Sequence, residues 1–210
     1  MAFHVRMNVM DIQFDWDEVD ALITLLDAQG VSYLLGNGSS FNRDDADIDA
    51  VQLIQRLAAC GYPLVENASI SLFLLHPDLA SAIIDALRQS NEPIAEQIAV
   101  LTLATLYLQQ WWIFRLTCAF GHLSQFPVAP FHALWEERGL PAPNAGSGLH
   151  GLFALQEYQQ QRTGLPLNFL EDWQNQINHL LTQEEAHHRE LPEDVRVVLR
   201  GISLQEGLSV

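Results

Sequence analysis

The spacing of apolar residues differs between the two parts of the chain. In the first part, short apolar runs bounded by Gly, Pro, Asn or Ser predict strands. Between these runs, apolar residues three and four positions apart predict amphipathic helices. The predicted strands are residues 3–9, 31–35, 62–65 and 70–75, and the predicted helices are about 15–29, 47–59 and 77–87. We therefore expect a small α/β unit over residues 1–92, with Glu66 and Asn67 in a hairpin turn.

From residue 93 onward the pattern is helical. Helices are predicted at about 93–120, 131–137, 149–161, 167–188 and 192–204. A stretch rich in Pro, Gly and Ser at 141–148 resembles a linker. The expected fold is therefore α+β and predominantly helical, with the α/β unit packed on a C-terminal helical bundle over residues 93–210. The boundary is a short polar stretch at 89–92, so one continuous domain is an open alternative.

One long segment of the expected bundle is almost free of charge. Between residues 97 and 135, Arg115 is the only residue with a charged side chain, counting Asp, Glu, Lys and Arg. Residues 97–114 approach the length of a membrane span, but they contain Thr and Gln side chains and lack flanking cationic residues. We therefore predict a buried core helix, which is covered either within the chain or in a homodimer. Arg115 then needs a carboxylate partner or a route to solvent, because an unpaired buried charge is costly.

The tryptophans of this segment suggest a candidate binding site. Trp111, Trp112 and Phe114 are expected where neighbouring helices converge, and Trp135 follows in the next predicted helix. Pockets lined by aromatic side chains are typical of small-ligand sites. One hypothesis is therefore a small-ligand binder, in which Trp111, Trp112 and Trp135 line the pocket.

The charge balance excludes several kinds of chemistry. The chain has no lysine: its 10 positive side chains are arginine, and 26 Asp and Glu residues give a net charge of −16. Schiff-base and phosphate-loop lysine chemistry is excluded, because guanidinium stays protonated. The negative charge disfavours binding to nucleic acid and to anionic membranes. It is compatible with a basic protein partner, and the more common alternative is that net charge keeps a protein soluble.

The two cysteines and the first residues bear on the compartment. Cys60 and Cys118 both stand in apolar helical contexts, so we expect buried free thiols. The first 14 residues contain no apolar leader-like run. These observations favour a cytoplasmic protein in a reducing compartment.

An acidic cluster follows a Gly/Ser-rich loop. Gly38 and Ser39 precede Asp47 and Asp49, and a predicted helix and strand precede the loop. This order resembles the opening of the nucleotidyltransferase superfamily that includes polymerase beta. The resemblance implies that Gly38 and Ser39 hold a nucleotide phosphate and that Asp47 and Asp49 hold magnesium. The chain departs from the pattern of this superfamily in two ways. The gap between Gly38-Ser39 and the Asp pair is shorter, and the residues after Asp49 have a helical pattern in place of the expected strand. The alternative is an acidic N-terminus of the second helix, which the helix dipole favours.

A second pair of residues suggests nuclease chemistry. Arg115 and His122 are separated by six residues. The spacing resembles the R-x(4–6)-H motif of HEPN ribonucleases, and the resemblance implies that Arg115 and His122 act together in a helical dimer cleft. A structural arginine and a histidine at a helix C-terminus explain the same pair.

The last predicted long helix contains a candidate metal motif. Glu184 with His187, and Glu185 with His188, have the i,i+3 spacing of half a di-iron site. The chain has no second Glu-x-x-His motif to complete such a site. Histidines in a last helical turn also complement the negative end of the helix dipole. We therefore expect neither a metal nor another cofactor.

The sequence favours a non-enzymatic, cytoplasmic interaction or regulatory protein. Its expected partner is another protein, reached through an acidic surface or an apolar groove. Two alternatives stay open. One is a nucleotidyltransferase-like or HEPN-like enzyme that acts on nucleotides or RNA, and the other is the small-ligand binder.

Overall fold

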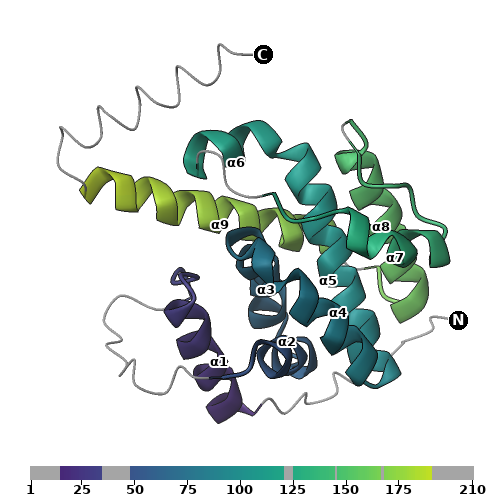
Figure 1. Cartoon of the computed structure of the whole chain (residues 1–210), viewed down its shortest axis with the longest axis horizontal. Helices are drawn as coiled ribbons and strands as arrows, with labels where there is room; N and C mark the ends of the chain where they lie inside the picture. Colours follow the sequence, from purple (N-terminus) through teal and green to yellow (C-terminus); the bar gives the residue numbers. More distant parts are fainter. Residues whose placement is uncertain (1–14, 35–47, 121–124, 145, 167, 191–210) are drawn as a thin grey trace, which may run out of the picture.

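The computed structural model describes residues 15–34, 48–120, 125–144, 146–166 and 168–190, without the side chains of the last three. Every regular element within these residues is a helix (Figure 1). The expected α+β fold is therefore wrong for this part of the chain, which is all-helical and has no α/β unit. In chain order the elements are α1 (Trp16–Ala28), α2 (Ala50–Ala59), α3 (Pro63–Leu75), the 3₁₀ turn η2 (Pro77–Leu79), α4 (Ala80–Gln89), α5 (Glu92–Trp111), α6 (Ile113–Phe120), the 3₁₀ turn η3 (Ala129–Phe131), α7 (His132–Glu137), α8 (Gly148–Thr163) and α9 (Phe169–Glu190).

The largest correction concerns α3, which occupies residues predicted as two strands and a hairpin turn. Pro63 stands in its first turn, where a missing N–H is tolerated. The Glu66 carboxylate accepts a hydrogen bond from the Gly61 backbone N–H at 2.7 Å. Residues 68–74 are all buried, so the helix has no polar face there. A helix that is enclosed on all sides shows short apolar runs like those of buried strands, because its 3.6-residue alternation is lost.

The strand predicted at residues 31–35 is also wrong where the structure describes it. α1 ends in a Schellman motif, in which the N–H of Val31 donates to Leu26 O at 2.8 Å and the N–H of Gly30 donates to Asp27 O at 2.9 Å. Gly30 has a φ of 84°, which its missing Cβ permits. The motif buries both Leu26 and Val31, so the apolar run belongs to a helix cap. The strand predicted at 3–9 lies outside the described residues.

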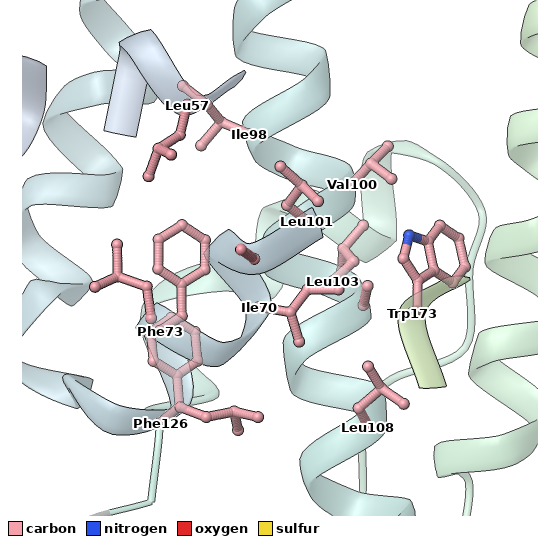
Figure 2. Packing of buried hydrophobic residues seen from close by; sticks show 14 of the residues in the cluster. Leu57, Ile70, Phe73, Ile98, Val100, Leu101, Leu103, Leu108, Phe126 and Trp173 are labelled. Atoms are coloured by element: carbon pink, nitrogen blue, oxygen red, sulfur yellow. The ribbon is translucent and has the colours of Figure 1, made fainter. Parts of the chain in front are cut away.

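The core forms around α3 and α5. Helices α2, α3, α4 and α8 pack on α5, and α9 packs on both α3 and α5. Figure 2 shows Ile70 and Phe73 of α3, Leu101 and Leu103 of α5, and Trp173 of α9 in one apolar cluster. One core therefore includes residues from both sides of position 92, and a domain boundary there stays a prediction.

The apolar segment predicted as one helix consists of two. α5 ends at Trp111 and α6 begins at Ile113, with Trp112 between them. Residues 98–109 are buried, as expected for a core helix, whereas α6 buries Leu116 alone of its eight residues. Among the helices in the described ranges, none by itself combines the length and apolarity of a membrane span. α3 and the helical residues 77–89 together have the required length and apolarity, but the chain bends by 105° between them.

Two glycines set the distance between α5 and α8. A Cβ atom at Gly148 would lie 2.6 Å from Trp111 N and from Tyr107 O, and one at Gly151 would lie 2.2 Å from the Tyr107 ring. No side chain occupies such space without displacing its neighbour. The stretch that resembles a linker therefore ends in a close helix–helix contact.

Candidate functional site

One part of the surface gathers large apolar side chains that face solvent. Seven such side chains are exposed in the described residues, and four of them lie on α5, α6 and α8. Phe114 is 85% exposed and Phe153 is 49% exposed, so neither contributes fully to the core. We call the four residues the apolar surface: Trp111, Phe114, Leu149 and Phe153.

Helix geometry brings the two halves of the apolar surface to one end of the molecule. Leu149 and Phe153 are four positions apart on α8 and share a face. Trp111 and Phe114 lie on either side of the break between α5 and α6. The contact of Gly148 with Trp111 holds the first turn of α8 against the last turn of α5, and Figure 1 shows the two helices side by side.

The segments that form the apolar surface carry almost no charge, although the chain is strongly acidic. Residues 97–135 and 139–156 contain one Asp, Glu, Lys or Arg between them, which is Arg115. Its guanidinium lies over the Trp112 ring, 4.7 Å from the ring centroid, and the residue is exposed. Arg115 thus has the route to solvent that it requires, together with an aromatic face that attracts its charge.

The structure brings two of the three tryptophans of the hypothetical ligand pocket into contact with each other. Trp111 and Trp112 pack edge to face with ring centroids 5.5 Å apart. Trp135 lies on α7, is 9% exposed, and contacts the ring of His132. The Trp112 indole N–H is buried without a hydrogen-bond partner, at a cost of about 1–3 kcal/mol. A small ligand at these residues stays a prediction.

The residues that resemble enzyme motifs are described only in part. Asp49 is the N-cap of α2, where its Oδ2 accepts a hydrogen bond from the Gln52 N–H at 3.3 Å. Gly38, Ser39 and Asp47 lie outside the described residues, and so does His122, the partner expected for Arg115. Nucleotide, magnesium and RNA chemistry at these positions therefore stays a prediction.

A second feature is a cleft of about 540 Å³ at the ends of several helices. Its walls come from the C-terminal ends of α1, α3 and α6 and from one face of α9. We call it the polar cleft, and its lining includes Gln29, Gly30, Ser32, Leu75, His76, Phe120, Leu180, Gln183, Glu184 and His187.

Hydrogen bonds from α9 and α3 fix the floor of the polar cleft. The Gln183 side-chain amide donates to Gly30 O at 2.7 Å, and its Oε1 accepts from the Ser32 N–H at 3.0 Å. The Nε2–H of His76 donates to Gln29 O at 2.8 Å, since a carbonyl can only accept. The turn after α1 is therefore held to two other helices by three hydrogen bonds.

A buried hydroxyl network lies next to this turn. The Tyr33 hydroxyl donates to Gln176 Oε1 at 2.7 Å and shares a hydrogen bond with the Ser71 hydroxyl at 3.0 Å. The Tyr33 ring also stacks on His179. Burial raises the pKa of Tyr33 well above its usual value, so its hydroxyl stays protonated and serves as a fixed donor.

The candidate metal motif on α9 borders the polar cleft. Glu184 and His187 line it, whereas the His188 side chain lies outside what the structure describes. In the described part of the chain, no group of three or more His, Cys, Asp or Glu side chains could hold a metal ion. Sequence reasoning missed Gln183, His76 and Gln29, because a glutamine or a lone histidine at a helix end carries no distinctive signal.

Comparison with known proteins adds no relative. No protein-family model, no curated protein and no solved structure matches this chain.

Proposed function

We propose that this protein acts without catalysis, by binding another protein through the apolar surface. The observation that supports this most is the exposure of Phe114, Phe153 and Trp111 on adjoining helices, in segments almost free of charge. Large apolar side chains exposed on neighbouring helices are typical of protein-interaction sites when they form one patch. Tryptophan, phenylalanine and arginine are also enriched at interfaces, and tryptophan and arginine dominate their energetics.

The apolar surface defines the chemistry of its partner. That partner needs an apolar surface of its own and a carboxylate within reach of Arg115, whose exposed guanidinium lies over Trp112. A second copy of this chain is disfavoured, because association would bring two net charges of −16 together. We therefore expect a different protein.

Site-specific photo-cross-linking tests the location of the contact. A photoreactive phenylalanine analogue at Phe114 is compared with the same residue at Asp20, which is exposed on α1. We expect one cross-linked partner protein at Phe114 and none at Asp20. Equal cross-linking at both positions, or cross-linking to a second copy of this chain, would contradict the proposal.

Binding of the purified partner then tests the energetics. Phe114→Ser should weaken binding about tenfold or more, as for a residue that dominates an interface. Leu165→Ser is the matched control, because Leu165 is 51% exposed and lies outside the apolar surface. Binding through apolar contact should also survive high salt. A steep loss of affinity with salt would instead assign the contact to the acidic faces of the molecule.

A further inference from the structure

The polar cleft gathers the ends of three helices with the same polarity. α1 ends at Ala28, α3 at Leu75 and α6 at Phe120, and residues at or next to these ends line the cleft. A helix C-terminus carries roughly half a negative elementary charge, because its last carbonyls lack helical partners. None of the three helices has a basic residue in its last turn. No basic side chain in these last turns offsets the negative potential, although backbone N–H groups cap carbonyls at the ends of α1 and α3.

Further oxygen atoms add to the negative potential. Glu184 brings a carboxylate to the wall, and the lining residues in the described part of the chain include two histidines, His76 and His187, but no arginine. The Gln29 and Gly30 carbonyls each accept one hydrogen bond, from His76 and Gln183. A carbonyl oxygen has two lone pairs, so each of the two can accept a second hydrogen bond from a cation.

The same cleft has an apolar wall. Leu75, Phe120 and Leu180 line it, and Leu180 is buried in the core beneath it. A ligand with a positive end and an apolar stem therefore finds a matching surface for each part.

We propose that the polar cleft binds an organic cation, an ammonium or guanidinium group on an apolar stem. The charged end lies at Glu184 and the carbonyls that follow α1, and the stem packs on Leu75 and Phe120. The volume of about 540 Å³ falls within the range of small-molecule sites. This site is separate from the apolar surface, and it does not depend on the proposed protein partner.

A pair of isosteric probes tests the need for charge. Butylguanidinium and butylurea have the same size and stem, but butylurea is neutral. Titration of the isotope-labelled full chain, followed by NMR, should show saturable shifts at Gly30 and Ser32 with butylguanidinium and at least tenfold weaker binding of butylurea. Equal affinity for the two probes, or no saturable shift with either, would overturn the proposal.

Two neighbouring substitutions separate a local site from diffuse attraction to an acidic protein. Glu184→Gln should weaken butylguanidinium binding about tenfold, because charge-assisted hydrogen bonds are about twice as strong as neutral ones. Glu185→Gln removes the same charge from the same helix, but Glu185 does not line the cleft. An equal effect of both substitutions would assign the binding to the net charge of −16 and sink the proposal.

An organic cation of this kind has two sources, a free small molecule and a basic side chain of a polypeptide. A pair of peptides distinguishes the two sources. A hexapeptide with one arginine is compared with its citrulline analogue, in which the side chain is neutral. Tighter binding of the arginine peptide than of butylguanidinium would identify a basic polypeptide as the source. Binding of butylguanidinium but not of the peptide would identify a free small cation.

Discussion

Arg138 and Glu96 form a two-point ion pair that joins the C-cap of α7 to α5. The Arg138 Nε donates to Glu96 Oε1 at 3.2 Å, and its Nη2 donates to Glu96 Oε2 at 2.5 Å. Both side chains are largely shielded from solvent, with 13% and 16% exposed. The Tyr158 hydroxyl of α8 donates to the same carboxylate at 2.8 Å, so one acidic side chain connects three helices.

Removal of one partner from this pair should destabilise the fold strongly. Arg138→Ala leaves the Glu96 carboxylate shielded and without its cation, at a cost of about 3 kcal/mol. The control is Arg88→Ala, because Arg88 and Asp85 are 3.5 Å apart with 74% and 51% of their side chains exposed. That substitution should cost less than about 1 kcal/mol. Urea unfolding of both variants checks the prediction, and equal losses would show that the Arg138 pair contributes no more than a surface pair.

The same pair should make stability depend on pH. Burial alone would raise the pKa of Glu96, but hydrogen bonds from Arg138 and Tyr158 and the charge of Arg138 outweigh it and hold that pKa below its usual value. An acid with a lowered folded-state pKa stabilises the fold above its unfolded-state pKa of about 4.3. The contribution is lost as pH falls through the lower folded-state pKa.

A Glu96→Gln variant isolates this contribution from the other carboxylates. Its free energy of unfolding should lie below that of the wild type at pH 7, and the difference should shrink as pH falls toward 3. Urea unfolding across this range measures the difference. A difference that stays constant with pH would show that the ionised form of Glu96 is not what the fold stabilises.

The glycine contact between α5 and α8 makes a steric prediction. Gly148→Ala would place a Cβ atom 2.6 Å from backbone atoms of Trp111 and Tyr107, which cannot move without separating the helices. We expect a loss of about 3 kcal/mol, at the upper end for overpacking. Gly139→Ala is the control, since its Cβ meets nothing within 4 Å and the cost is only that of a positive φ, about 1–2 kcal/mol. Thermal unfolding compares the two, and equal melting temperatures would contradict the contact.

The two thiols should differ in reactivity, although the sequence predicted both as buried. Cys118 is exposed on α6, whereas Cys60 is half-buried after α2. Burial also raises the pKa of the Cys60 thiol, which lowers its fraction of reactive thiolate. A thiol reagent should therefore label Cys118 at least about tenfold faster. Labelling of Cys60→Ser and Cys118→Ser assigns the rates, and equal rates would contradict the difference in exposure.

Sequence pattern predicted the amphipathic helices well and the enclosed one badly. α1, α2 and α4 each have a buried face that repeats with helical spacing, as Leu22 and Leu26 do in α1. α3 has no such face because it is buried on all sides, and Val31 resembled a strand residue because a helix cap places it in the core. The break at Trp112 carries neither Gly nor Pro, so no local signal marked it.

The candidate sites were harder to predict than the helices. The polar cleft joins Gly30 to Gln183, which are 153 positions apart, and the pattern around either residue says nothing about the other. Exposure of Phe114 could not be predicted either, because an apolar helix gives no indication of which side remains uncovered. For Arg115 the sequence predicted either a carboxylate partner or a route to solvent, and the structure has the route to solvent.

The enclosure of α3 has a consequence for synthesis on the ribosome. α3 packs against α1 and α2, which precede it, and against α5 and α9, which follow it, and Figure 1 shows it among them. A growing chain therefore carries an apolar helix whose last cover, α9, begins only at Phe169. Until that helix emerges, the side of α3 that faces it, which includes Ser71 with its hydrogen bond to Gln176 O, lacks its final cover. That is the condition under which nascent chains aggregate or recruit chaperones. Chains that stop before α9 should fail to accumulate as folded protein.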